Sequence, residues 1–196
     1  AAGPYLDSLE CWVSLTVAAS YTRRIEFGSM VSPVTFRHPA LLARMAAQID
    51  DLSGGRLTLG LGAGWQEREH HNFGVPFYDR TTRFAMFEEG VELTTRLLES
   101  DTPVNYQGKY FTLDDAILLP RPQRKTPILI GGNGATKTLP LAARYADEWN
   151  GVFVAPEKDR GRYTLLDQSC AQIGRAPNLI KRSVMTKVNY FHDQAE

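Results

Sequence analysis

The chain has 196 residues, 43% of them hydrophobic and 22% charged, which is ordinary globular composition with enough apolar material for a core. Because 22 basic residues balance 22 acidic ones, no net charge favours nucleic acid or an anionic membrane as a partner. We expect neither a leader nor a bilayer-spanning helix, since the apolar stretches fall short of the roughly 20 residues that a span requires. Cys11 and Cys170 have no motif spacing, so we expect free thiols and a cytoplasmic location.

Apolar runs and helical periodicities alternate along the chain. In chain order the patterns predict a helix over 9–20, a strand over 25–31, a helix over 39–52, a strand over 57–61, a helix over 83–98, a β-hairpin over 104–113, a strand over 128–130, a helix over 136–146, a strand over 149–154, a helix over 158–173 and a strand over 183–190. This alternation predicts an α/β fold with a parallel sheet covered by helices. Glycine-rich strand ends recur on several strands, which favours a TIM-type (β/α)8 barrel over an open sheet.

Two predicted strands end in glycines, at residues 60–64 and 131–134. The first group does not match the dinucleotide fingerprint, and either a ligand contact or tight strand-to-helix packing would explain it. The second fails as a P-loop because Thr136, not glycine, precedes Lys137. Free N–H groups of Asn133 and Gly134 at a helix start would still favour an anion such as a phosphate.

The densest polar cluster contains Glu67, Glu69, His70 and His71. Its spacing lacks the second motif of a di-iron site and the pattern of a zinc protease, so we expect no metal. A solvated helix start, or hydrogen bonds to a ligand, is the preferred interpretation. Arg37-His38 suits either a ligand contact or a helix cap, and Glu88-Glu89 is interpreted as a solvated helix face.

Several segments resemble the luciferase-like monooxygenase superfamily, and within it the oxidoreductases that use coenzyme F420. The resemblance covers nearly the whole chain and is strongest at residues 36–43, 50–57, 60–65, 68–77 and 146–150. It implies a single luciferase-like domain over 1–196 that is partial, with about five of the eight strand–helix units of the barrel and a β-hairpin insertion. The N-terminal strands and the closing C-terminal elements would lie outside this chain.

The resemblance also implies which residues would bind a flavin or deazaflavin at the carboxyl ends of the strands. A non-proline cis peptide is expected at Met30–Val31, against the central ring of the cofactor. Ala63 and Gly64 would contact the cofactor at the next strand end. The phosphate would lie on Gly132, Asn133 and Gly134, and Glu69 and Trp149 are further candidates. No catalytic residue is assigned.

The function implied is hydride transfer between F420 and a small organic substrate, with the redox chemistry supplied by the cofactor. With FMN in its place, the reaction would be a monooxygenation. A non-catalytic flavin-binding barrel is a third interpretation, and an incomplete chain without any ligand is a fourth. An incomplete barrel would expose sheet edges and apolar surface, so association with like chains is expected to be possible.

Overall fold

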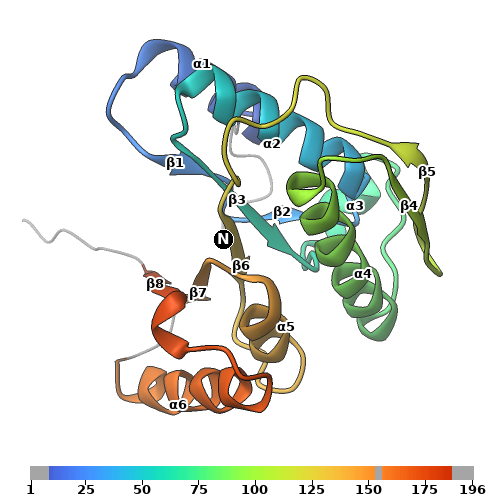
Figure 1. Ribbon diagram of the computed structural model, residues 1–196. Coiled ribbons are helices and arrows are strands. Elements are labelled where there is room, and N and C mark those ends of the chain that lie inside the picture. The colour runs from blue at the N-terminus through green and yellow to red at the C-terminus, as the bar shows by residue number, and fades with distance from the viewer. Residues whose placement is uncertain (1–8, 153–155, 187–196) are drawn as a thin grey trace, which may run out of the picture.

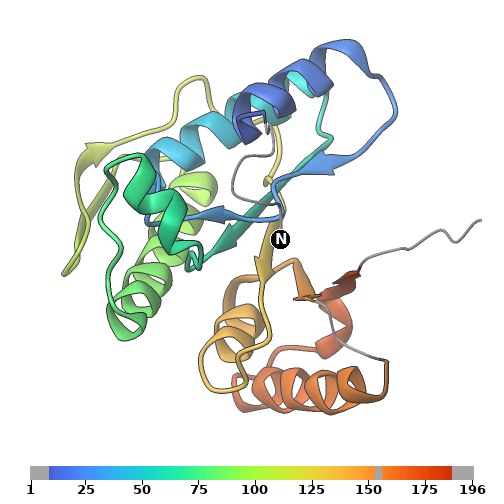
Figure 2. The same cartoon turned by 180° about the vertical axis from the view of Figure 1, so that it is seen from behind.

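The computed structural model describes residues 9–152 and 156–186. Its main sheet has six strands: β1 (Phe27–Gly28), β2 (Ser32–Pro33), β3 (Leu57–Gly62), β6 (Ile128–Gly131), β7 (Glu148–Val152) and β8 (Lys181–Met185). They run in the order β1-β3-β6-β7-β8, with β2 also paired to β3, and every pairing is parallel. The curved sheet is visible from both sides in Figure 1 and Figure 2.

The helices are α1 (Cys11–Tyr21), α2 (Pro39–Ser53), α3 (Glu67–Asn72), α4 (Arg80–Glu99), α5 (Thr138–Tyr145) and α6 (Pro156–Gln172), with a short 3-10 turn at Pro177–Leu179. Along β3, Leu57, Leu59 and Leu61 are fully buried in the hydrophobic core, toward the helices that cover the sheet. The alternate residues, Gly60 and Gly62, point to the opposite face. A parallel sheet with helices on its outer face confirms the α/β prediction and is the arrangement of an incomplete (β/α) barrel.

The predicted helix over 39–52 closely matches α2, because its end signals are strong. Pro39 stands at the first helical position, where its missing N–H has no intrahelical role. The His38 side chain caps the start of the helix by accepting the N–H of Ala40. Gly54 ends α2 in the left-handed conformation, at φ 73°, which glycine adopts without a steric penalty.

The predicted strand over 25–31 is wrong as a continuous element. It is divided into β1 and β2, and both pair with β3. Between them the hydroxyl of Ser29, which is 3% exposed, donates to the carbonyl of Gly60 and accepts the N–H of the same residue. The side chain of Ser29 therefore takes the place of a backbone pairing at this point. The ends of the predicted strands at 153–154 and 187–190 lie outside the described residues.

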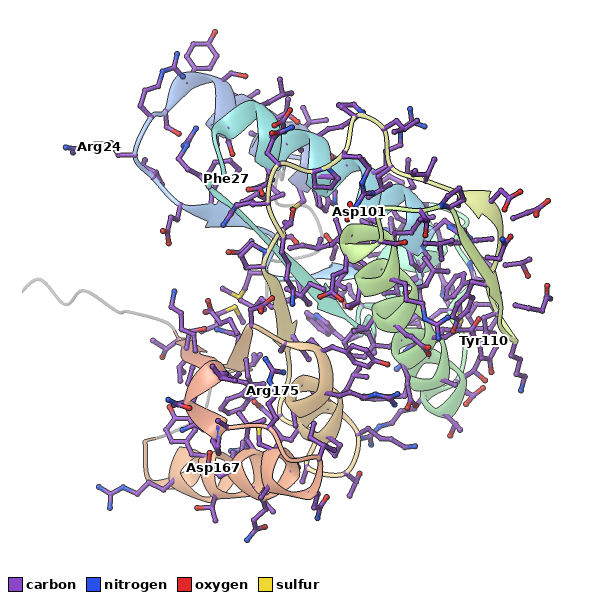
Figure 3. The ribbon with its side chains drawn as sticks, in the orientation of Figure 1. Arg24, Phe27, Asp101, Tyr110, Asp167 and Arg175 are labelled. Atoms are coloured by element: carbon purple, nitrogen blue, oxygen red, sulfur yellow. The ribbon has the colours of Figure 1, made fainter. Side chains whose placement is uncertain are left out.

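A two-stranded antiparallel hairpin, β4 (Val104–Gln107) and β5 (Thr112–Ala116), confirms the predicted insertion. Its turn is bound to α4 by Glu89, whose carboxylate accepts the backbone N–H groups of Lys109, Tyr110 and Phe111. Figure 3 shows Tyr110 at this end of the hairpin. The interpretation of Glu88-Glu89 as a solvated face is therefore wrong for Glu89, whereas Glu88 is exposed.

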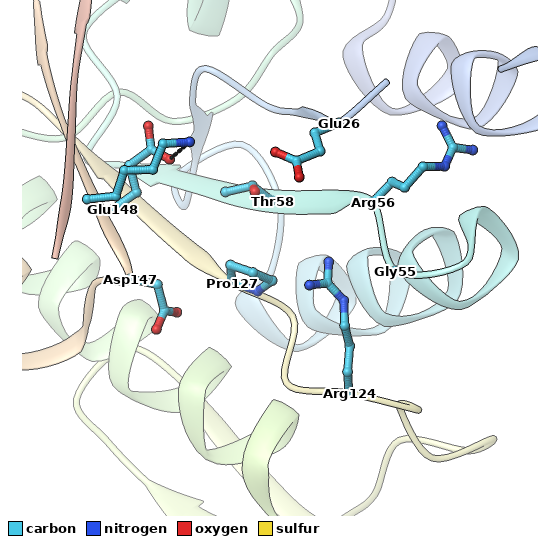
Figure 4. Close-up of a pocket in the computed structure, with 9 residues that line it drawn as sticks. Glu26, Gly55, Arg56, Thr58, Arg124, Pro127, Asp147 and Glu148 are labelled. Atoms are coloured by element: carbon cyan, nitrogen blue, oxygen red, sulfur yellow. Dashed lines mark ion pairs between the residues drawn. The ribbon is translucent and has the colours of Figure 1, made fainter. Parts of the chain in front are cut away.

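The amino ends of the strands are held by buried charge. Asp50, which is 3% exposed, forms two hydrogen bonds with the guanidinium of Arg124, both of 2.8 Å. The same carboxylate accepts the N–H of Leu57 at the start of β3. A cavity of about 170 Å³ at this end is lined by groups of both signs (Figure 4). Two of its lining residues, Arg56 and Arg124, donate hydrogen bonds to groups of the protein itself.

Candidate functional site

The register of the parallel strands brings the two glycine-rich strand ends to one edge of the sheet. On one side of β3, Gly62 pairs with Pro33 of β2. On its other side, the preceding residue Leu61 pairs with Ile130 of β6. Residues 63–64 and 132–134 therefore both leave the sheet at its carboxyl edge, from neighbouring strands. Ligands of parallel α/β sheets bind at this edge, because the connecting loops and helix starts converge there.

Val31 fills the concave face of the sheet beneath this edge. The peptide bond between Met30 and Val31 is cis, as the sequence resemblance predicted. A Cβ atom on Gly62 would lie 2.4 Å from Cγ2 of Val31, and one on Gly131 would lie 2.8 Å from its Cγ1. Only glycine at these two positions leaves room for the Val31 side chain, which explains glycine inside two apolar strands. Met30 is 54% exposed beside it.

The turn at 132–134 combines an unusual backbone with a bound side chain. Gly132 has φ 127°, a conformation that residues with a Cβ rarely adopt. The amide of Asn133 both donates to the carbonyl of Val152 (2.7 Å) and accepts its N–H (3.0 Å). The Asn133 side chain is therefore committed to β7, and only its backbone is left for a ligand. Among the described residues, no acceptor binds the backbone N–H groups of Asn133 and Gly134, ahead of α5.

Glu69 and Trp149 lie in different surroundings. Glu69 is exposed on α3, in the segment that follows Gly64. Trp149 is fully buried on the outer face of β7, where its ring meets Tyr163 of α6 edge-on at 5.7 Å. Its indole N–H donates to the carbonyl of Gly132 (2.8 Å). Trp149 is thus in contact with the 132–134 turn but does not face the concave side of the sheet.

His70 is part of the core of the loop between β3 and α4. It is 1% exposed and shares a 2.9 Å hydrogen bond with the hydroxyl of Thr35. Its other ring nitrogen lies 2.8 Å from the carbonyl of Gln66. The solvated interpretation therefore holds for Glu67 and His71, which are exposed, and is wrong for His70. No group of metal-binding side chains occurs within 9–152 and 156–186.

The remaining polar candidates at the start of α2 have structural roles. Arg37 forms an ion pair with Glu10, and His38 is the N-cap of the helix. Burial lowers the pKa of His38 below its usual value, which favours the neutral ring that can accept the N–H of Ala40. Between the two possibilities that the sequence left open, the structure supports capping.

Two polar residues on the concave face were not singled out from the sequence. Ser29 joins β3 immediately before the cis peptide, as described above. Asn150 of β7 is 1% exposed and pairs with Gly131 in the register of the sheet. Each of these residues interrupts or follows an apolar run. A polar residue inside an otherwise buried strand is the sequence signal that could have identified both as candidates.

Comparison with known sequences identifies the family. The sequence model described as luciferase-like monooxygenase matches residues 2–196. The chain belongs to the luciferase-like monooxygenase family. It spans about half the length of the curated relatives that it matches, as the incomplete barrel indicates.

The proteins that resemble this chain include some named as F420-dependent enzymes and others named as monooxygenases. An F420-dependent glucose-6-phosphate dehydrogenase of Microbacterium testaceum is 30% identical over 178 residues, covering 88% of this chain and 51% of the relative. A 4-hydroxyprotoasukamycin monooxygenase of Streptomyces nodosus subsp. asukaensis is 36% identical over 135 residues, covering 69% of this chain and 35% of the relative. Among solved structures, an F420-dependent secondary alcohol dehydrogenase in complex with an F420-acetone adduct has a TM-score of 0.85 at 26% identity. The match covers 93% of this chain and 55% of the dehydrogenase chain.

Proposed function

We propose that this chain forms the cofactor-binding part of an oxidoreductase that uses coenzyme F420 to transfer a hydride to or from a small organic substrate. The observation that carries the proposal is the convergence of residues 63–64 and 132–134 on one edge of the sheet, above Val31. Relatives and a solved structure named as F420-dependent support the choice of cofactor. A cytoplasmic location and association with like chains belong to the same proposal.

The residues at the carboxyl edge fit such a cofactor. A phosphate carries negative charge, and the N–H groups of Asn133 and Gly134 lie ahead of α5, whose amino end favours an anion. A Cβ on Gly134 would lie 2.8 Å from Oγ1 of Thr138, so the turn has no space for a larger residue. Gly132, Asn133 and Gly134 would hold the phosphate through their backbone.

Met30 and Val31 would lie against the ring, and Ala63, Gly64 and Glu69 would line its edge. Bound there, the cofactor would supply the hydride chemistry. The task of the chain itself is to orient the ring and to exclude water from one of its faces. Trp149 would act through its hydrogen bond to Gly132 and not by direct contact.

FMN-dependent monooxygenation is the second candidate, because a relative named as a monooxygenase is 36% identical to this chain. A non-catalytic flavin-binding protein is the third. Titrating the purified protein separately with F420 and with FMN, and following the spectrum of the ligand, distinguishes the first two candidates. We expect tighter binding of F420, whereas tighter binding of FMN would support the monooxygenase. Turnover, measured separately, would exclude the non-catalytic carrier.

The residues of the phosphate turn can be tested in the same titration. We expect Gly134→Ala to weaken cofactor binding, because its Cβ would displace Thr138 at the start of α5. Gly161→Ala is the matched control, since a Cβ on that helical glycine meets nothing within 4 Å. Equal affinities of the two variants would contradict a phosphate site at 132–134.

A further inference from the structure

A chain of polar side chains runs along the concave face of β7 and β8. Lys181 forms an ion pair of 3.3 Å with Glu148, marked by the dashed line in Figure 4. The hydroxyl of Ser183 donates to the other carboxylate oxygen of Glu148. The Nδ2 atom of Asn150 lies 2.8 Å from the same hydroxyl. The chain therefore begins with a charged pair near the amino ends of the strands and finishes at Asn150, nearer the carboxyl edge.

The charge of Glu148 fixes the orientation of the Asn150 amide. A carboxylate can only accept hydrogen bonds, so the single proton of the Ser183 hydroxyl is used for Glu148. The hydroxyl oxygen can then only accept, which requires the NH₂ group of Asn150 to face it. Turning the amide over would place two acceptors against each other. The carbonyl oxygen of Asn150 is consequently directed away from this chain of hydrogen bonds.

That oxygen is buried and has no hydrogen-bond partner within residues 9–152 and 156–186. A buried acceptor without a partner is unfavourable, so this oxygen calls for a donor that the described residues do not supply. Asn150 is aligned with Gly131, and the concave side of Gly131 is covered by Val31. Side chains of register partners in a parallel sheet project to the same face. The free oxygen therefore lies at the level of Val31, where the cofactor ring is proposed to bind.

We infer that Oδ1 of Asn150 accepts a hydrogen bond from the imide N–H of the pyrimidine portion of the cofactor ring. This inference rests on the proposed function, and it adds a residue that forms a hydrogen bond with the edge of the ring. The imide is a neutral donor, which suits a neutral amide oxygen in a buried site better than it would suit a charged group. F420 and FMN both carry this imide, so Asn150 selects for the ring class and not between the two cofactors.

The test compares Asn150→Leu with the unaltered protein, using F420 and an analogue methylated at the imide nitrogen. The unaltered protein is expected to bind F420 about fivefold to tenfold more tightly than the methylated analogue, which is the range of one hydrogen bond. Asn150→Leu should lose this preference and bind both ligands with equal, lower affinity. Its thermal midpoint without ligand should change little, because the substitution removes an unsatisfied acceptor together with the hydrogen bond that Asn150 donates to Ser183. Asn105→Leu, on the hairpin, is the matched control and should retain the preference.

Three results would overturn the inference. One is an unchanged F420 affinity in Asn150→Leu, and another is a preference for the imide that survives the substitution. The third is a fall in thermal midpoint together with equal losses for both ligands, which is the behaviour of a purely structural amide. If the Leu variant does not fold, Ser183→Ala serves instead, because it frees the amide to rotate and should reduce the preference. Failure of the unaltered protein to bind F420 or FMN would contradict the proposed function itself.

Discussion

Gly62 is the position where one added methyl group should have a large and calculable effect. The Cβ of Gly62→Ala would lie 2.4 Å from Cγ2 of Val31, more than 1 Å inside the usual carbon–carbon contact of about 3.5–4.0 Å. Val31 is β-branched and has few alternative rotamers, so it cannot rotate away freely. Overpacking of this kind costs about 1–3 kcal/mol. We expect Gly62→Ala to lower the free energy of unfolding by that amount.

Urea denaturation of Gly62→Ala, Val31→Ala and the double variant provides the test. If the clash is the cause, Val31→Ala should relieve it, and the double variant should be more stable than the sum of the single effects predicts, by about 1 kcal/mol or more. Gly161→Ala, in an exposed helix with open space around it, should instead stabilise the protein by about 0.5–1 kcal/mol. Additive effects of the substitutions at 62 and 31 would refute the packing argument.

Three further outcomes follow from other contacts. Asp50→Ala leaves Arg124 without its carboxylate and should lower the free energy of unfolding by about 3 kcal/mol in a urea titration, whereas a loss below about 1 kcal/mol would contradict the role given to the pair. Glu89→Leu should release the hairpin turn, so hydrogen exchange of the amide of Phe111 should quicken roughly tenfold; unchanged exchange would exclude the anchor. Because burial lowers the pKa of His38, its neutral form favours folding; stability should therefore fall as the pH is lowered through and below 6.5, and His38→Asn, which keeps a capping side chain, should remove this dependence.

The elements that could be predicted from the sequence are those determined by local patterns. The apolar run over 57–61 and the glycines that follow it specify β3 and its end. The helix over 39–52 has a proline start and a glycine stop within its own sequence. Parallel pairing then follows from the alternation of strands and helices, and it places both glycine-rich strand ends at one edge. Local pattern and general topology were sufficient for these features.

The features that were missed depend on residues far apart in the sequence. The break between β1 and β2 requires the hydroxyl of Ser29 to reach Gly60, 31 residues away. The role of Glu89 depends on a turn that begins 20 residues later. The orientation of Asn150 depends on Ser183, 33 residues further along. The residues next to these side chains in the sequence do not indicate their partners. Periodicity alone therefore assigns them to a solvated position or gives them no role.

The network around Asp50 lies at the opposite end of the strands from residues 63–64 and 132–134. Its hydrogen bonds join α2, β3 and the segment before β6 without involving any loop of the carboxyl edge. A library of variants that randomises only the exposed positions of the β3–α4 segment, Glu67, Glu69 and His71, and keeps the buried His70, should therefore retain a high proportion of folded members. Randomising the segment that carries Arg124 should yield few, although it lies far from the proposed cofactor site.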